Sequence, residues 1–269
     1  MADDICVIPL FSSSEGNSTL VRVRDHNFLI DIGKNCKQTC LALSKVNTLP
    51  EDIDGVFITH YHSDHVAGMD VFGRKYKVPF YATEGTFDYM RYCRGRAPEN
   101  FDRVIGEKST VTFDFGVEIS SYPTPHDAEG SVVYKINNCS AGKSAVVMTD
   151  LGYVTKGMLK FAEGADIALI ESNYDKMMLE YGEYPEPLKR RIKGEGGHIS
   201  NDESKLFAEF LIGSGTKNII LGHISPHNNT PEIARKTVAS YLKERGLTEG
   251  KDYFLQTADR VNPVKGFKV

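Results

Sequence analysis

Apolar and polar residues alternate in short blocks along the first third of the chain, a pattern typical of β-strands. A helical period begins at residue 36, and a second one follows the apolar run at 55–58. We therefore expect a sheet that opens the fold and then alternates with helices. The expected elements are strands at 6–10, 19–24 and 27–32, a helix at 36–46, a strand that ends before His60 and a helix at 66–76.

Strand patterns return in the middle of the chain, and strands and helices alternate after that point. Two helix starts are clear: Ser200 and Glu203 form a capping-box pattern, and Thr230 precedes a proline. The segments around Asp31 and Asp150 share a weak internal sequence similarity, an echo of one pattern, because each aspartate follows an apolar strand and precedes an aliphatic residue and a glycine. This echo predicts two similar halves that face each other. The later strands are expected at 110–113, 117–122, 131–136, 144–148, 167–170 and 218–221.

The length of 269 residues allows one or two domains, and we expect a single domain over residues 1–269. The composition, 41% hydrophobic and 25% charged, is ordinary for a soluble globular protein. The first residues do not show the basic segment followed by a long apolar segment that is typical of a signal peptide. No stretch approaches the ~20 apolar residues that are needed to cross a bilayer. We therefore expect a cytoplasmic protein that does not contact membranes. The five cysteines include no Cys-x-x-Cys pair, which favours buried free thiols over disulfides or a thiolate zinc cluster.

The net charge of −4 gives no general attraction to nucleic acid, so a nucleic-acid partner requires a local basic patch. Residues 91–96 combine three arginines with a tyrosine, and residues 189–193 hold four basic side chains shortly before His198. Each run is also compatible with an ordinary solvated face.

A dense group of metal-ligand residues follows the apolar run at 55–58. His60, His62, Asp64 and His65 lie within six consecutive positions. Because alternate residues of an extended segment point the same way, His60 and His62 can converge on one ion. Asp64 and His65 come after the turn, where they can reach a second ion. The spacing predicts a two-metal site, and the alternative is a polar loop with solvated histidines.

Three later residues stand at positions suited to complete this site. His126 lies in a loop that follows a strand and is stiffened by two prolines, and such a loop presents a ligand rigidly. Asp150 ends a strand, where its carboxylate can bridge two cations and offset their repulsion, or form an Asx turn instead. His223 also ends a strand. The candidate metal ligands are His60, His62, Asp64, His65, His126, Asp150 and His223.

In this order, the ligands resemble those of the metallo-beta-lactamase superfamily, and the match covers most of the chain. The resemblance implies an α/β fold, specifically an αββα sandwich of two similar halves. Asp31 matches an early strand-end aspartate that supports the ligand loop, although a structural turn also explains it. The resemblance implies, position by position, that His60, His62 and His126 bind the first metal. Asp64, His65 and His223 would bind the second metal, and Asp150 would bridge the two.

Several further segments narrow the resemblance. The stretches 12–18, 171–175, 197–201 and 228–232 are similar to those of the YycJ/WalJ/VicX group, bacterial proteins of the superfamily that are regarded as DNA exonucleases. Tyr174 departs from that group, which more often has His there, so a catalytic role of that His would not transfer.

Two ligand positions argue against other activities of the superfamily. Asp150 stands where beta-lactamases often have Cys, and His62 stands where redox di-iron members often have Glu. Antibiotic hydrolysis and oxygen chemistry are therefore disfavoured.

The expected chemistry is phosphodiester hydrolysis. Two cations about 3.5 to 4 Å apart would lower the pKa of a bridging water and neutralise charge on a phosphoryl group. Asp64 or Asp150 would hold the bridging hydroxide, and His198 would contact the phosphate or protonate the leaving group. The hydroxyl-rich loop at 12–18 could present donors to a phosphate, although a tight turn explains it equally well. The expected substrate contacts are Ser12, Ser14, Asn17, Asn173 and His198.

The sequence thus favours a dinuclear metal-dependent phosphodiesterase or exonuclease that acts on DNA or on another phosphodiester. Histidine and aspartate ligands suit zinc, manganese and iron alike, so the pattern does not identify the two divalent ions. One alternative is a small-molecule hydrolase of a cyclic phosphodiester, a thioester or a lactone. Another is a regulatory protein without turnover, for which Tyr174 is the signal.

Overall fold

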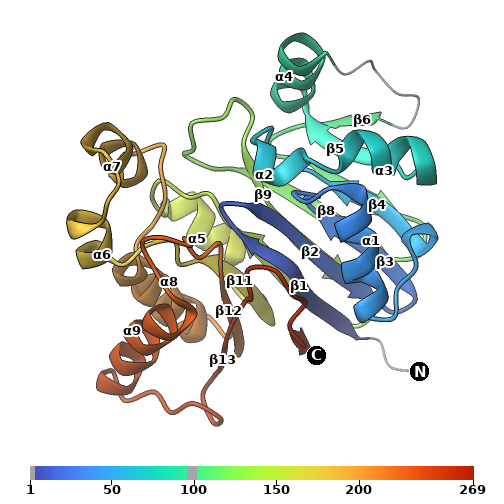
Figure 1. Ribbon diagram of the computed structural model, residues 1–269. Coiled ribbons are helices and arrows are strands. Elements are labelled where there is room, and N and C mark those ends of the chain that lie inside the picture. Colours follow the sequence, from blue (N-terminus) through green and yellow to red (C-terminus); the bar gives the residue numbers. More distant parts are fainter. Residues whose placement is uncertain (1–3, 96–101) are drawn as a thin grey trace.

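The computed structural model describes residues 4–95 and 102–269. Two seven-stranded sheets lie against each other, and helices cover the outer side of each sheet (Figure 1). Each sheet combines antiparallel strands with parallel strands, and the helices connect the parallel ones. The α/β prediction is confirmed, and the layers follow the order helix, sheet, sheet, helix.

The first sheet is built mainly from N-terminal residues. β1, β2 and β3 pair as antiparallel neighbours, and β4, β5 and β6 continue in parallel from β3. The short C-terminal strand β14 closes the edge beside β1. The strands are β1 (Ile5–Ser13), β2 (Gly16–Val23), β3 (His26–Ile30), β4 (Ile53–Phe57), β5 (Phe80–Thr83), β6 (Asp102–Ile105) and β14 (Phe267–Lys268), and the connecting helices are α1 (Cys36–Lys45), α2 (Ser63–Val66), α3 (Met69–Tyr76) and α4 (Glu84–Arg94), with a 3-10 turn at Pro50–Asp52.

The second sheet repeats this plan. β7 to β10 are antiparallel, and β11, β12 and β13 continue in parallel from β10. The strands are β7 (Thr110–Phe113), β8 (Val117–Pro123), β9 (Val132–Asn138), β10 (Lys143–Met148), β11 (Ile167–Glu171), β12 (Asn218–Gly222) and β13 (Phe254–Thr257), and the helices are α5 (Lys156–Ala162), α6 (Lys176–Tyr181), α7 (Glu186–Lys193), α8 (Asn201–Gly213) and α9 (Pro231–Glu244).

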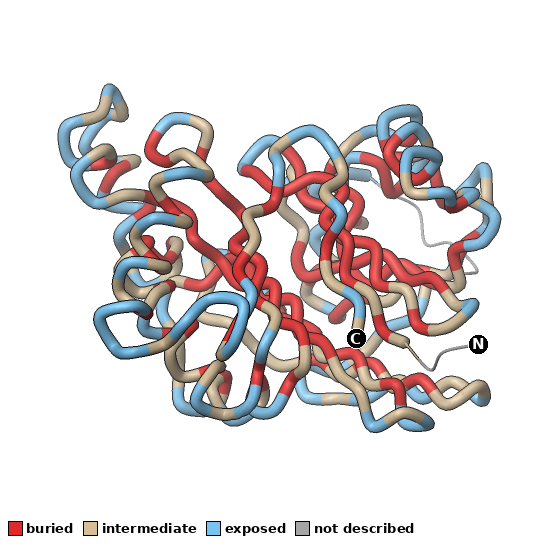
Figure 2. The backbone as a smooth tube through the Cα atoms, turned by 90° about the horizontal axis from the view of Figure 1, so that it is seen from below, coloured by how far each residue is buried: buried red, intermediate tan, exposed pale blue. Residues whose placement is uncertain are grey.

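Three apolar clusters hold these layers together. The central cluster joins the facing sides of the two sheets and includes Phe28, Phe57 and Tyr134. A second cluster packs α1 and α3 on the first sheet, and a third packs α8 and α9 on the second. The inner strands of both sheets are accordingly the most continuously buried segments (Figure 2), whereas the edge strands β6, β7 and β14 contain no buried residue. Burial on both faces explains why several strands read as apolar runs rather than as strict alternation.

The expected strands all form, but the helix expected at 66–76 is divided. α2 begins at Ser63, before the expected start, and α3 begins only at Met69. Gly68 lies between them, and a side chain at this position would collide with the carbonyl oxygen of Lys34. The N–H of Gly68 donates to the carbonyl of Ile32 at 2.9 Å rather than to a carbonyl of α2, which interrupts the helical hydrogen bonds and makes α2 and α3 separate helices.

Both predicted helix starts are confirmed. The backbone N–H of Ser200 donates to Glu203 Oε2 at 2.8 Å, and the Ser200 hydroxyl accepts from the Glu203 N–H at 3.3 Å. The Thr230 hydroxyl likewise accepts from the N–H of Ile233 at 3.1 Å. These caps stabilise the first turns of α8 and α9, which directly follow loops that carry candidate site residues.

Replacement of Ser200 by Ala should lower the free energy of unfolding by about 1 kcal/mol, because the first turn of α8 loses its side-chain cap. Urea denaturation measures this change. Ser140→Ala, in the exposed turn after β9, is the matched control and should leave the midpoint unchanged. Equal midpoints for both variants would show that the cap contributes nothing.

None of the helices in the described part of the chain is long and apolar enough to cross a membrane. All five cysteines are free, as expected. Cys36 is buried and Cys6 and Cys40 are partly buried, but the expectation of burial is wrong for Cys93 and Cys139, which are exposed. The reason is local: Cys93 lies in the last turn of α4, and Cys139 lies in the turn after β9.

Candidate metal centre

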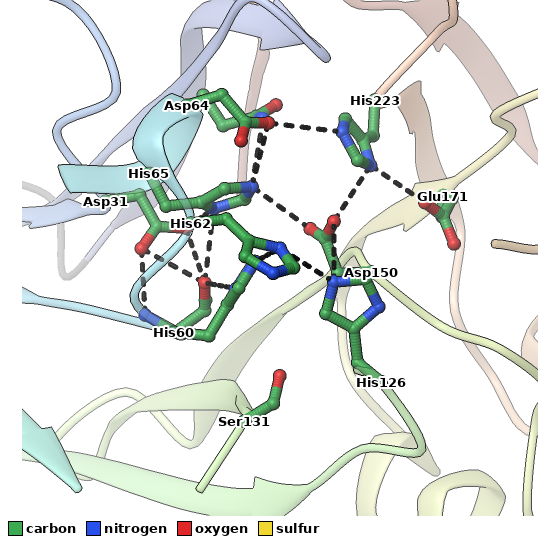
Figure 3. A network of polar contacts seen from close by, with 12 residues as sticks. Asp31, His60, His62, Asp64, His65, His126, Ser131, Asp150, Glu171 and His223 are labelled. Atoms are coloured by element: carbon green, nitrogen blue, oxygen red, sulfur yellow. Dashed lines mark hydrogen bonds and ion pairs between the residues drawn. The ribbon is translucent and has the colours of Figure 1, made fainter. Parts of the chain in front are cut away.

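Candidate ligands and the supporting Asp31 come together where four strands end. Asp31 follows β3, His60 follows β4, Asp150 follows β10 and His223 follows β12, and Figure 3 shows these side chains facing one another. Asp31, Asp150 and His223 have positive φ angles of 63°, 62° and 52°. Such backbone is costly for residues other than glycine and is concentrated at functional sites. The matching angles of Asp31 and Asp150 give a structural counterpart to their sequence echo.

One group of ligands consists of three histidines. His60 Nε2 lies 3.0 Å from His62 Nδ1, and His126 Nε2 lies 3.2 Å from that same Nδ1 (Figure 3). Burial lowers the pKa of all three imidazoles, most strongly that of His60. Neutral imidazoles carry the lone pairs that bind metal. The three nitrogens therefore suit one divalent cation.

The second group consists of Asp64, His65 and His223. Asp64 Oδ2 lies 3.3 Å from His65 Nε2 and 3.8 Å from His223 Nε2. Within the described chain, His223 Nε2 is buried and has no hydrogen-bond partner. Burial would lower the pKa of His223, but the carboxylates of Asp150, Asp64 and Glu171 raise it to about 10. This concentration of negative charge favours a cation.

Asp150 lies between the two groups. One carboxylate oxygen, Oδ2, is 3.4 Å from His65 Nε2, and the other is 3.8 Å from His126 Nε2. Oδ2 is buried and has no hydrogen-bond partner among the described residues. Burial would raise the pKa of Asp150, but the surrounding imidazoles, with His223 first, hold it well below its usual value. An ionised carboxylate at this point can contact cations in both groups.

The seven expected ligands therefore fall into neighbouring groups, and within each group the donor atoms lie within 4.8 Å of one another. Two of them present buried polar atoms that no described protein group satisfies. Buried polar atoms of this kind normally have a partner. The nitrogen and oxygen donors fit divalent cations of the zinc, manganese or iron type.

Comparison with known proteins decides the family. A family model described as "Beta-lactamase superfamily domain" matches residues 26–224. The chain belongs to this superfamily. It is 34% identical to Exodeoxyribonuclease YycJ of Bacillus anthracis over 95% of this chain and 96% of that one. It is 36% identical to Exodeoxyribonuclease WalJ of Streptococcus pneumoniae serotype 2 over 91% of this chain and 90% of that one.

Solved structures support the fold alone. The metallo-beta-lactamase fold protein YhfI from Bacillus subtilis is 15% identical, covers 100% of this chain and 99% of its own, and has a TM-score of 0.70. The predicted αββα sandwich and the predicted relationship to the YycJ/WalJ group are confirmed. With its ligand cluster, this beta-lactamase superfamily member is a metal-dependent hydrolase.

Asp31 holds the ligand His65 in place through the ring nitrogen that faces away from the other ligands. Its carboxylate lies 2.8 Å from His65 Nδ1 and accepts hydrogen bonds from the backbone and hydroxyl of Thr59. The contact with Nδ1 leaves His65 Nε2 directed at Asp64 and Asp150. Asp31 therefore occupies the supporting position that the resemblance implied.

Glu171 orients two other histidines in the same way as Asp31 orients His65. The sequence patterns assigned no role of its own to Glu171. Its Oε1 lies 2.9 Å from His198 Nδ1 and 2.8 Å from His223 Nδ1. Its Oε2 accepts from the backbone N–H groups of Leu151 and Ile199. Burial would raise the pKa of Glu171, but His198 and His223 lower it to about 2. The available sequence signal was its place at the end of β11, within the 171–175 segment.

The candidate substrate contacts divide into two kinds. Ser14 and His198 line a pocket of about 280 Å³ above the ligands. Ser12, Asn17 and Asn173 are buried, and the backbone of His223 donates to Ser12 Oγ at 2.7 Å. Asn17 donates to Asp64 Oδ2 at 3.2 Å, and Asn173 donates to the His223 carbonyl at 2.9 Å. This geometry supports ligand positioning for these three and lends no support to the expected direct substrate contact.

Tyr174 lies outside the lining of this pocket. It is 5% exposed and packs with Leu179 and Ile192 beneath α6 and α7. Burial, the largest effect, raises the pKa of its hydroxyl well above the usual value. A packing role explains this tyrosine without loss of any metal ligand.

The two basic runs differ in their relation to the site. Arg91 forms ion pairs with Glu84 and Asp88 on its own helix, α4, and Arg96 lies outside the described residues. The run at 189–193 forms part of α7, and its Arg191 lines the pocket above the ligands. The sequence could not distinguish Arg191 from its neighbours.

Proposed function

We propose that the chain is a two-metal phosphodiesterase that removes nucleotides from DNA ends. The observation that carries the proposal is the position of Asp150 between two groups of three ligands. The DNA substrate is supported by 34% and 36% identity to proteins named exodeoxyribonucleases, over more than nine tenths of the chain. We further propose that residues 1–269 form one domain, since a shared apolar cluster joins the two sheets, and that this domain acts in the cytoplasm.

The two proposed cations fit the chemistry of phosphodiester cleavage. His60, His62 and His126 would hold one, Asp64, His65 and His223 the other, and Asp150 would contact both. When bound, they supply Lewis acidity that activates water and neutralises charge on phosphoryl oxygens.

His198 is the proposed general acid. It lines the pocket, and its Nδ1 is held by Glu171 at 2.9 Å, which leaves Nε2 for the substrate. A proton on Nε2 would pass to the leaving oxygen of the phosphodiester bond that is cleaved. Ser14, at the tip of the hairpin between β1 and β2, is the proposed hydroxyl donor to the phosphate.

Removal of metal should abolish hydrolysis while the fold remains. The chelated protein is incubated with end-labelled single-stranded and double-stranded oligonucleotides, before and after addition of zinc, manganese or iron(II). We expect mononucleotides only after metal is restored, and circular dichroism should report retained secondary structure. Intact oligonucleotides with every metal would contradict the proposal. Turnover restricted to cyclic phosphodiesters, thioesters or lactones would instead identify a small-molecule hydrolase.

A further inference from the structure

Arg191 places a permanent positive charge at the rim of the metal centre. It lies in the last turn of α7 and lines the same pocket as Ser14, Asp150 and His198. Among the described residues that line this pocket, it is the only lysine or arginine. Its side chain is 51% exposed, so a ligand in the pocket can reach it.

Asp127 fixes the orientation of this guanidinium. Arg191 Nε donates to Asp127 Oδ2 at 2.6 Å, and Nη2 donates to Oδ1 at 3.1 Å. The same Oδ1 lies 3.5 Å from Nε2 of both His62 and His126. In addition, the Asp127 N–H donates to the carbonyl of Gly196, which ties the loop after α7 to the loop of His126. The guanidinium is thus held beside the first histidine group.

One edge of the guanidinium is available to a ligand. Arginine carries five N–H donors, and in residues 4–95 and 102–269 only Asp127 accepts from Arg191. The Asp127 contacts use Nε and Nη2, which leaves Nη1 without a protein acceptor in those residues. Phosphate oxygens match the planar donor geometry of arginine.

We propose that Arg191 binds the phosphate of the substrate at this edge while Asp127 keeps the guanidinium oriented. The inference rests on the proposed phosphodiesterase function and identifies the protein group that recognises the phosphate. Asp64 and Asp150 carry negative charge toward the same pocket. A cationic side chain at the rim offsets their repulsion of an anionic substrate.

The other basic residues of α7 have different surroundings. Lys189 is buried and donates to the carbonyl of Glu180 at 2.7 Å, and Lys193 pairs with the carboxylate of Glu180 at 2.8 Å. Arg190 is exposed and does not belong to the residues that line the pocket. Arg190 therefore provides a matched control, because its replacement removes the same charge from the same helix.

The first test compares Arg191→Met with Arg190→Met in the metal-loaded protein. Fluorescence anisotropy measures binding of a labelled phosphorothioate single strand, which resists hydrolysis, over a range of salt concentrations. Arg191→Met should weaken binding about 10-fold, since a charge-assisted hydrogen bond is lost. It should also reduce the slope of log K against log salt by about 0.7. Arg190→Met should stay within about 2-fold of the unmodified protein.

The second test uses inorganic phosphate as the probe and does not depend on DNA. Phosphate should raise the melting temperature of the unmodified protein and of Arg190→Met, but not that of Arg191→Met. Metal content is measured for every variant. If Arg191→Met loses metal, Arg191→Lys replaces it in both tests. Lysine keeps the charge but lacks the planar donors, so this variant should show a smaller loss of oligonucleotide affinity and of the phosphate effect.

The outcomes separate this inference from the proposed function. If the strand does not bind but the phosphate effect depends on Arg191, the DNA proposal fails and the role of Arg191 stands. If the variant at Arg191 keeps both the oligonucleotide affinity and the phosphate effect, or if Arg190→Met behaves identically, the inference is overturned.

Discussion

Replacement of Asp150 by Asn should reduce turnover about a thousandfold and lower the metal content below that of the unmodified protein. The carboxylate lies within 3.4 Å of His65 Nε2 and 3.8 Å of His126 Nε2, between the two ligand groups. A neutral amide cannot offset the repulsion between two divalent cations, and such electrostatic terms are worth several kcal/mol. Elemental analysis of the purified protein and kcat on an oligonucleotide measure the two effects.

The Asp150→Asn variant should still fold, which makes the result interpretable. Asn has nearly the same shape as Asp and tolerates the positive φ of 62° that Asp150 adopts. Asp25→Asn, in the exposed turn between β2 and β3, is the control for the same chemical change far from the ligands. Unchanged metal content and kcat in Asp150→Asn would remove the basis for a two-metal site.

The candidate ligands were predictable because their chemistry is concentrated. His60, His62, Asp64 and His65 lie within six positions, and the remaining three each follow a strand or a rigid loop. Strand ends on one side of a sheet meet in space, so a strand-end pattern carries tertiary information. The layered fold was similarly accessible, since apolar runs and helical periods alternate along the chain.

Other features of the site were not predictable, because they depend on contacts between distant segments. Glu171 contacts residues 27 and 52 positions away, and Arg191 contacts a residue 64 positions away. A local pattern does not specify such partners. The same limit applies to Ser12, Asn17 and Asn173: the sequence gives their polarity, whereas only the fold determines whether they face the pocket or the ligands.

Glu171→Gln should weaken one of the two metals selectively. The glutamate accepts four hydrogen bonds, two at Oε1 from His198 and His223 and two at Oε2 from backbone N–H groups. Glutamine has the same size but only one acceptor oxygen, so its amide must face two donors whichever way it turns. Each buried donor left unpaired costs about 1 to 3 kcal/mol.

The two ligand groups depend on Glu171 to different extents, and this difference makes the test specific. His223 belongs to the second group, whereas among the described residues His60, His62 and His126 form no hydrogen bond or ion pair with Glu171. Competition with a graded series of chelators should therefore show one metal at normal affinity and one bound about 10-fold to 100-fold more weakly, as for other groups that orient metal ligands. Glu51→Gln, on the exposed 3-10 turn, should change neither affinity. Equal weakening of both metals would point to a general loss of structure, and only unequal weakening would assign Glu171 to the orientation of His223.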